Sequence, residues 1–248
     1  MSKAKVSIAI ETSCRRGGVA LGVGDELAAT ADFDASARHG TQLVSRLAEM
    51  LAGASVRPAD VREVYVSVGP GSFTGTRIGV TVARMLALAV PNVRCVAVSS
   101  PGAVAEAARR LDWEHLGVVL DAREGWIHAT RFHRRSPDGA IDQPGPGELM
   151  RPAEFLRLAP RPIVLLGEGL GCHDLAAEGV SIPPPASADA PPHLPEAASV
   201  WRVGRRLARA GRFTDAAQLL PAYSRKPEAV RLWERNREID ARPPAADN

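Results

Sequence analysis

Three extended runs open the chain and restrict its fold more than any other feature. They cover residues 6–11, 17–23 and 27–33, are rich in Val, Ile, Leu and Ala, and are separated by short turns. This spacing predicts an antiparallel meander of three strands. A helical stripe follows over 39–54, where apolar residues stand at 43, 47, 50, 51 and 54 and Val44 and Ala48 add a second strip beside it.

The remainder of the first hundred residues alternates strand and helix. We expect strands at 61–68 and 94–98 and helices at 74–90 and about 101–111. The order β-β-β-α-β-α-β-α is typical of an α/β unit in which helices cover a mixed sheet.

A second strand-rich segment begins at residue 116 and repeats the opening of the chain. Runs at 116–121 and 126–133 predict a hairpin, and 163–166 a buried strand. At about 150 residues per domain, the length of 248 residues fits two lobes, which we place at 1–106 and 107–240, with a tail at 241–248 that we expect to be disordered. In the second lobe we further expect a loop at 136–151, helices at 152–158, 196–211 and from 214, and an extended proline-rich segment at 183–195.

The predicted helix at 74–90 carries only two charges, Arg77 and Arg84, seven residues apart and so on one face. A helix on the outside of one sheet needs an apolar arc of only about 100°, so a helix that is apolar nearly all round must be covered on its second side too. We interpret this face as a partner surface, with burial by the chain's own second lobe as the alternative. The predicted interface residues are Val44, Ala48, Leu51, Arg77, Val80, Arg84 and Leu88.

Charge gives only weak support for nucleic-acid binding. The chain has 31 Lys and Arg against 28 Asp and Glu, a net charge of +3, and a pI near 9.0. Arginines at 202, 205, 206, 209 and 212 form a basic stripe along and just after the helix at 196–211, which predicts either a solvated face or contacts with nucleic-acid phosphates. An aromatic content of 4% leaves few side chains for base stacking.

The sequence shows no pattern typical of a signal peptide, a membrane span or a cysteine motif. The N-terminus has no apolar core of a signal peptide, and no stretch reaches the roughly 18 apolar residues of a membrane span. Cys14, Cys95 and Cys172 are far apart and form no C-x-x-C motif. We therefore expect a protein of the reducing cytosol.

Two short segments have the composition of anion-binding turns. The loop at 69–75 (GPGSFTG) lies between a strand and a helix, and the turn that begins with Glu11, Thr12 and Ser13 leads into Gly17. Free backbone N–H groups in such turns favour anions, although an ordinary tight turn is the alternative for the segment that begins with Glu11. The loop at 69–75 is not a Walker A motif, because no lysine lies near it.

These segments together resemble the TsaB family, also called YeaZ. The resemblance rests on IAIETSCRRGGVALG at 8–22, VSVGPGSFTGTRIGVTVARMLAL at 66–88, VVLDAR at 118–123 and PAYSRKPEAVRLWE at 221–234, and it spans nearly the whole chain. It implies a two-lobed α/β fold of the actin/Hsp70/sugar-kinase (ASKHA) type, with a mixed sheet and helices in each lobe, and a cytoplasmic location.

The resemblance also implies a function without catalysis. TsaB-type proteins are accessory partners in the synthesis of threonylcarbamoyladenosine in tRNA, where they associate with the catalytic paralogue TsaD and the ATPase TsaE. They form homodimers through the N-terminal helices that also bind TsaD. Because the arginines of this chain are scattered over both lobes, we expect contact with tRNA to be indirect, through the partner. No catalytic residue and no intrinsic cofactor are implied, and ATP or ADP between the lobes is the candidate ligand, at Thr12, Ser13, Gly17, Gly167 and Gly169.

A histidine pair separates this chain from the catalytic paralogue. The paralogue carries two histidines at i and i+4 on its first helix, which places both imidazoles on one face toward a metal. Here His39 is followed by Leu43 at i+4. We therefore predict no metal site at this helix, and we expect no compensating pair among the other histidines, at 115, 128, 133, 173 and 193.

Some positions depart from the family pattern and keep an enzymatic alternative open. Glu11 stands where Asp is common, Trp126 and His128 follow the Asp-Ala-Arg segment, and Ser224 replaces an aliphatic residue. The alternative is a stand-alone nucleotide-dependent ASKHA enzyme, with Glu11 and Asp121 as acidic groups. A peptidase-like hydrolase lacks a nucleophile paired with a base, and Ser72 is better explained as a turn residue.

Overall fold

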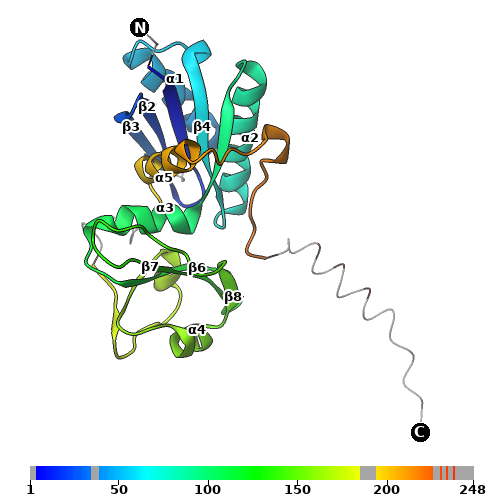
Figure 1. Cartoon of the computed structure of the whole chain (residues 1–248). Helices are drawn as coiled ribbons and strands as arrows, with labels where there is room; N and C mark the ends of the chain where they lie inside the picture. The colour runs from blue at the N-terminus through cyan, green and yellow to red at the C-terminus, as the bar shows by residue number, and fades with distance from the viewer. Residues whose placement is uncertain are drawn as a thin grey trace.

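The chain folds into two lobes, each built on one five-stranded mixed sheet (Figure 1). The computed structural model describes residues 4–34, 39–184 and 194–225, together with the helical positions Val230, Trp233 and Arg237. The predicted tail at 241–248 and most of the proline-rich segment lie outside the described residues. No helix in the described ranges is long and apolar enough to cross a bilayer.

The first sheet has the strand order β3-β2-β1-β4-β5. β1 pairs antiparallel with β2, and β2 with β3, which confirms the predicted meander, whereas β4 and β5 run parallel to β1. The strands are β1 (Val6–Glu11), β2 (Arg16–Val23), β3 (Glu26–Asp34), β4 (Val61–Gly69) and β5 (Arg94–Ser99), and the helices between them are α1 (His39–Gly53), η1 (Pro58–Asp60) and α2 (Phe73–Ala89).

The second sheet repeats this topology in the order β8-β7-β6-β9-β10. β6, β7 and β8 are antiparallel neighbours, and β9 and β10 continue in parallel from β6. Its elements are β6 (His115–Asp121), β7 (Ile127–His133), β8 (Glu148–Met150), α4 (Pro152–Leu158), β9 (Ile163–Leu166), η3 (Glu168–Gly171) and β10 (Val180–Ser181). The same strand order in both lobes is that of the expected ASKHA fold.

Two apolar clusters cover opposite faces of the first sheet. On one face, Leu43, Leu47 and Val80 from α1 and α2 pack on Ile8 and Val64. On the other, α5 (Ala197–Arg209) contributes Val200 and Trp201, which pack on Ala9, Tyr65 and Val96. The first lobe is therefore a three-layer α/β/α unit.

Helix α3 (Ser100–Ala107) and the short η2 (Ala108–Arg110) lie between the two lobes (Figure 1). Ala103 belongs to the cluster under α5, while Val104, Ala105 and Ala108 pack against Leu116 and other residues of the second sheet. The opposite face of the second sheet is covered by α4 through Phe155. One helix therefore shares its residues between both cores and couples the lobes.

The C-terminal third of the chain differs from the sequence-based expectation in three ways. Helix α5, which we assigned to the second lobe, packs on the first sheet. The predicted loop at 136–151 contains the edge strand β8, and the helix expected from residue 214 is only the 3-10 turn η4 (Ala216–Gln218) followed by extended chain to 225. These differences depend on long-range packing, which local periodicity does not report.

Candidate functional site

The predicted anion-binding turns pack directly against each other. The backbone N–H of Ser72 donates to the carbonyl oxygen of Ser13 over 2.6 Å. A Cβ on Gly71 would lie 2.1 Å from that same oxygen, and a Cβ on Gly75 would lie 2.0 Å from the carbonyl oxygen of Thr12. Glycine is therefore required at 71 and 75 for the β1–β2 turn to approach the start of α2.

Two backbone N–H groups in the first turn of α2 are satisfied by Ser72 of this chain. The Ser72 hydroxyl accepts from the N–H of Gly75 over 3.2 Å, and the Ser72 carbonyl accepts from Thr76. Gly17 likewise has a packing role, because a Cβ there would lie 2.2 Å from the ring of Phe33. These contacts explain the glycines without a ligand, and nucleotide binding at Thr12, Ser13 and Gly17 stays a prediction.

A chain of buried hydroxyls leads from Glu11 across the carboxyl ends of β1, β4 and β5. Glu11 Oε1 accepts from the N–H and the hydroxyl of Ser13, at 2.5 and 2.6 Å. Ser100 Oγ donates to Ser13 Oγ over 2.8 Å and lies 2.7 Å from Ser67 Oγ. Glu11 Oε2 and Thr12 Oγ1 are buried and have no hydrogen-bond partner among the described residues. This edge is where ligands bind in open α/β sheets.

Burial decides the protonation of this cluster. It raises the pKa of Glu11 to about 7, against the opposing effect of the Ser13 hydrogen bonds. The pKa of the Cys14 thiol is raised above its usual range, first by burial and then by the Glu11 charge. Cys14 is therefore a neutral thiol rather than an activated nucleophile.

The second lobe places acidic groups near the β1–β2 turn, since the charge of Glu168 acts on Cys14 in that turn. Glu168 in η3 has its pKa raised by burial and then by the charge of Asp121, while Arg15 acts in the opposite sense. Asp121 Oδ1 lies 2.9 Å from His173 Nε2. Where both carboxyl groups are ionised, Glu168 and Asp121 disfavour a bare phosphate, so a phosphate bound here would require a counter-cation.

Gly167 and Gly169 also have a packing explanation. Gly167 has a positive φ of 109°, and a Cβ there would lie 2.3 Å from the carbonyl oxygen of Val119 in β6. At Gly169 a Cβ would lie 2.9 Å from the Val119 side chain. Both glycines let η3 cross close to β6, so their assignment to a nucleotide stays a prediction as well.

The predicted partner surface contains both exposed and buried residues. Val44 is 54% exposed and Leu88 80%, and Met85, which the sequence analysis did not select, is 58% exposed. Ala48 is also exposed. Leu51 and Val80, in contrast, are only 5% and 3% exposed, because they pack into the core beneath α1 and α2. These two residues cannot contact a partner in this conformation, which corrects their assignment.

We call Val44, Ala48, Met85 and Leu88 the α1–α2 surface. Met85 and Leu88 lie three residues apart on α2, a spacing that places them on one helix face. No described part of the chain buries them, so the second lobe does not cover this side of α2 in the way that the alternative interpretation required. An exposed apolar face of this kind is typical of a protein interaction site.

Arg77 is exposed and also makes contacts within the chain, so its assignment to the partner surface stays a prediction. Its guanidinium carbon lies 3.9 Å from the centre of the Phe73 ring, and its Nε donates to the hydroxyl of Tyr223 over 2.9 Å. The rings of Phe73 and Tyr223 are 4.9 Å apart. Arg84 lies half-buried farther along α2. The C-terminal segment thus borders the α1–α2 surface at the start of α2.

The segment at 219–225 is anchored to both lobes, which the sequence did not predict. Leu219 is buried in the core under α2, and the N–H of Ala222 donates to the carbonyl of Val68 over 2.6 Å. Arg225 donates to the carbonyl of Ala122 over 2.9 Å and to Glu124 over 2.8 Å. The segment therefore links the first core to the β6–β7 turn.

The arginine stripe on α5 is largely paired within the protein. Arg205 and Arg209 both contact Asp25, and Arg206 lies 3.0 Å from Glu106. The opposite face holds Val200 and Val203 in the core. These ion pairs favour the interpretation of a solvated, structural face over a phosphate-binding one.

One histidine pair was missed by the sequence analysis. The β6–β7 register places His115 directly opposite His133, although the two residues are 18 positions apart and no spacing rule joins them. His128 lies five residues before His133 on the same strand. Because successive residues of a strand alternate between its faces, His128 and His133 lie on opposite faces of the sheet. The expectation of no histidine pair outside the first helix is therefore wrong.

Comparison with known proteins agrees with this architecture. The family model described as "TsaD: tRNA N6-adenosine threonylcarbamoyltransferase" matches residues 33–205. The "tRNA threonylcarbamoyladenosine biosynthesis protein TsaB" of Bacillus subtilis is 28% identical over 229 residues, which cover 91% of this chain and 96% of that protein. The Escherichia coli protein of the same name is 29% identical over 129 residues, 51% of this chain and 54% of that protein.

A solved structure extends the likeness to three dimensions. YeaZ from Pseudomonas aeruginosa superposes with a TM-score of 0.72 at 24% identity, covering 88% of this chain and 99% of that one. A second Pseudomonas aeruginosa structure is described as similar to peptidase YeaZ. It superposes with a TM-score of 0.73 at 24% identity and covers 89% of this chain and 100% of that one. Both share the two-lobed fold over nearly their whole length.

Proposed function

Because the chain belongs to the TsaD family of threonylcarbamoyltransferase-related proteins, and within it to the TsaB (YeaZ) group, we propose that it is a non-catalytic partner of a TsaD-type protein. In this function it supports the formation of threonylcarbamoyladenosine in tRNA and performs no chemistry itself. The observation that carries the proposal is the α1–α2 surface, where Leu88 is 80% exposed and Met85 58%.

The apolar side chains of this surface supply a driving force for association. Burying an exposed Leu, Met or Val side chain contributes about 1.5–3 kcal/mol each. Three such side chains on two adjacent helices provide the apolar centre of an interface. A partner helix pair that covers them would stabilise one arrangement of the TsaD-type subunit, provided that it binds that arrangement more tightly than the others.

The proposal extends to the other expected partners. A homodimer through α1 and α2 would compete with the TsaD-type protein for the same residues, whereas a TsaE-type ATPase would join the resulting complex. The paired arginines of α5 support an indirect contact with tRNA, through the partner rather than through this chain.

Leu88→Glu is expected to weaken the complex with the TsaD-type partner by at least tenfold, because it places an unpaired charge in an apolar interface. The double variant Met85→Glu/Leu88→Glu is expected to lose co-elution altogether. Size-exclusion chromatography with light scattering on mixtures of the two proteins measures both effects, and circular dichroism checks the fold.

Leu158→Glu is the matched control. Leu158 is 44% exposed, but it lies on α4 in the second lobe, so the variant should co-elute like the wild type. Val80→Glu is not a suitable probe, because Val80 is 3% exposed and its replacement would unfold the core. Wild-type affinity of the double variant for the TsaD-type partner would overturn the assignment of the α1–α2 surface as the interface.

A stand-alone nucleotide-dependent enzyme is the second candidate, favoured only by Glu11. A carboxyl group with a pKa near 7 at the carboxyl ends of parallel strands is typical of a functional site. Against this function, Glu11 is 0% exposed, so a substrate cannot reach it in this conformation. Calorimetry with MgATP on the isolated protein decides the matter: tight binding with turnover would support the enzyme and contradict the accessory function.

A further inference from the structure

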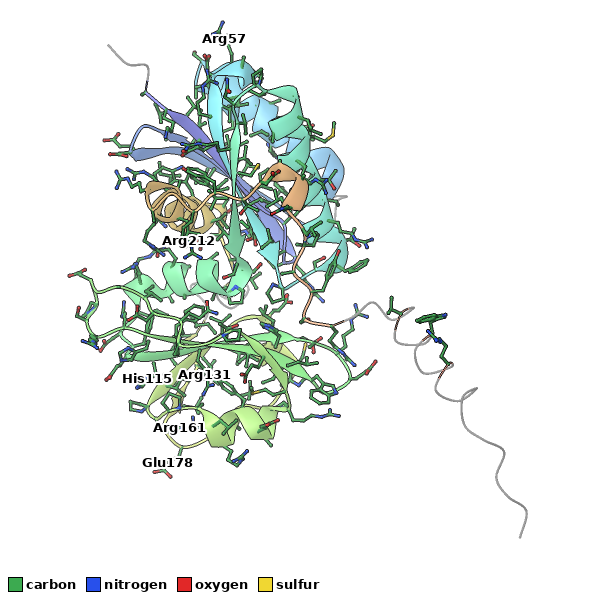
Figure 2. All side chains as sticks on the ribbon, turned by 45° about the vertical axis from the view of Figure 1, so that its right-hand side comes forward. Arg57, His115, Arg131, Arg161, Glu178 and Arg212 are labelled. Atoms are coloured by element: carbon green, nitrogen blue, oxygen red, sulfur yellow. The ribbon has the colours of Figure 1, made fainter. Side chains whose placement is uncertain are left out.

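Three potential metal ligands meet at one end of the β6–β7 hairpin. His115 and His133 are directly opposed in the register, and their ring centres are 5.1 Å apart. Glu114 Oε1 lies 3.9 Å from His115 Nε2 and 3.5 Å from His133 Nε2. Figure 2 labels His115 at the side of the second lobe.

From this cluster we propose that Glu114, His115 and His133 form a binding site for a divalent transition-metal ion, with a remaining coordination position open to solvent. One ligand atom from each residue lies within 4.8 Å of the others. Zinc bonds of about 2.0–2.2 Å to N and O in tetrahedral geometry place ligand atoms about 3.3–3.6 Å apart. Small side-chain rotations therefore bring the three atoms onto one ion.

The backbone around these ligands is already fixed. The carbonyl of Glu114 accepts from the N–H of Arg134 over 3.0 Å. The Arg134 side chain, 1% exposed, donates from Nε to the carbonyl of Trp113 over 2.9 Å and stacks over the Trp113 ring. Strand pairing holds the two histidines. A metal would therefore bind without the entropic cost of ordering the chain around it.

The ligand chemistry favours a borderline transition metal over Mg²⁺ or Ca²⁺. Two imidazoles and one carboxylate suit Zn²⁺, Ni²⁺ or Cu²⁺, whereas the alkaline-earth ions prefer oxygen ligands alone. The side chains of His115 and His133 are 27% and 30% exposed, and that of Glu114 is 66% exposed. An ion from solution can therefore reach all three. The plain alternative is that Glu114 pairs with protonated histidines and binds no metal.

Titration of the full-length, untagged and EDTA-treated protein with ZnCl₂ at pH 7.5 tests the proposal. Competition with a chromophoric chelator should give one equivalent of tightly bound Zn²⁺. His115→Ala and His133→Ala should each lower the affinity at least tenfold, and Glu114→Gln should lower it while leaving the fold intact, because this side chain is exposed. Co²⁺ should give visible d–d bands in the wild type that both histidine variants lose.

Two controls isolate the cluster from other ligands on the same lobe. Glu178→Gln removes an exposed carboxylate outside the cluster (Figure 2), and Cys172→Ser removes the exposed thiol. Both variants should bind Zn²⁺ like the wild type. Unchanged affinity in both histidine variants, a loss of binding in Cys172→Ser, or wild-type binding only at millimolar Zn²⁺ would each overturn the site.

Discussion

Arg134→Ala is expected to lower the free energy of unfolding by about 3–5 kcal/mol, because it removes four hydrogen bonds donated by a charged group and leaves their carbonyl acceptors without that donor. Arg134 is 1% exposed, and its guanidinium donates to the carbonyl groups of Trp113 and Arg109, both over 2.9 Å. It also donates to the carbonyls of Leu111 and Pro137. The carbonyls of 109, 111 and 113 fall in the connection from α3 to β6, so this one side chain fixes the joint between the lobes.

Urea denaturation followed by circular dichroism measures this loss. Arg135→Ala removes the neighbouring exposed arginine and should change stability by less than about 0.5 kcal/mol. Arg134→Lys should remain destabilised, because an ammonium group cannot reach four carbonyls that a planar fork reaches together. Equal unfolding midpoints for the two alanine variants would contradict the assignment.

The same arginine bears on the proposed metal site. The backbone N–H of Arg134 donates to the carbonyl of Glu114. A substitution of the Arg134 side chain that distorts the backbone at this joint should therefore also displace Glu114, one of the proposed zinc ligands. Variants that are folded but destabilised at Arg134 should therefore show weaker Zn²⁺ binding than Arg135→Ala.

Local pattern predicted the strands and helices of the first lobe well. The meander of β1, β2 and β3 and the helices α1 and α2 lie where alternation and helical periodicity placed them. The repeated hairpin of β6 and β7 was predicted in the same way. Each of these elements buries a regular face, and that regularity is what a sequence displays directly.

Pairing across the chain was not predictable, and the missed features share this cause. His115 and His133 meet only through the β6–β7 register, and Tyr223 reaches Arg77 only because 219–225 crosses α2. Helical periodicity identified α2 as unusually apolar, but it could not say which side faced the sheet. For this reason Val80 was assigned to the partner surface although it lies in the core, whereas Leu88 and Met85 are exposed. Met85 could have been found from its spacing of three residues from Leu88.

Glycine-rich loops have two explanations that composition alone does not separate. The loop at 69–75 matched an anion-binding turn, yet its glycines are required because a Cβ on Gly71 or Gly75 would lie only 2.1 Å or 2.0 Å from a carbonyl oxygen of the β1–β2 turn. Both explanations need a bare backbone. Only the position of the neighbouring chain decides which one requires the glycine.

Glu11→Gln is expected to stabilise the protein above pH 7 and to have little of this effect below pH 4.5. Burial raises the pKa of Glu11 from its ordinary value of 4.5 to about 7 in the folded chain. Between these values the folded state binds more protons than the unfolded state, so the stability due to this group falls as the pH rises. It is fully present below 4.5 and is lost as the pH passes through about 7.

Glutamine does not titrate, so the difference between variant and wild type should grow in favour of the variant by up to about 3 kcal/mol between pH 4.5 and 8. Thermal and urea unfolding at several pH values measures the difference, with the exposed Glu154→Gln as a control that should follow the wild type. A difference independent of pH would mean that Glu11 is ionised throughout this range. In that case the buried hydroxyls of Ser13, Ser67 and Ser100 would have to stabilise a full carboxylate charge, and the cluster at the ends of β1 and β4 would be a preorganised anion site rather than a neutral polar core.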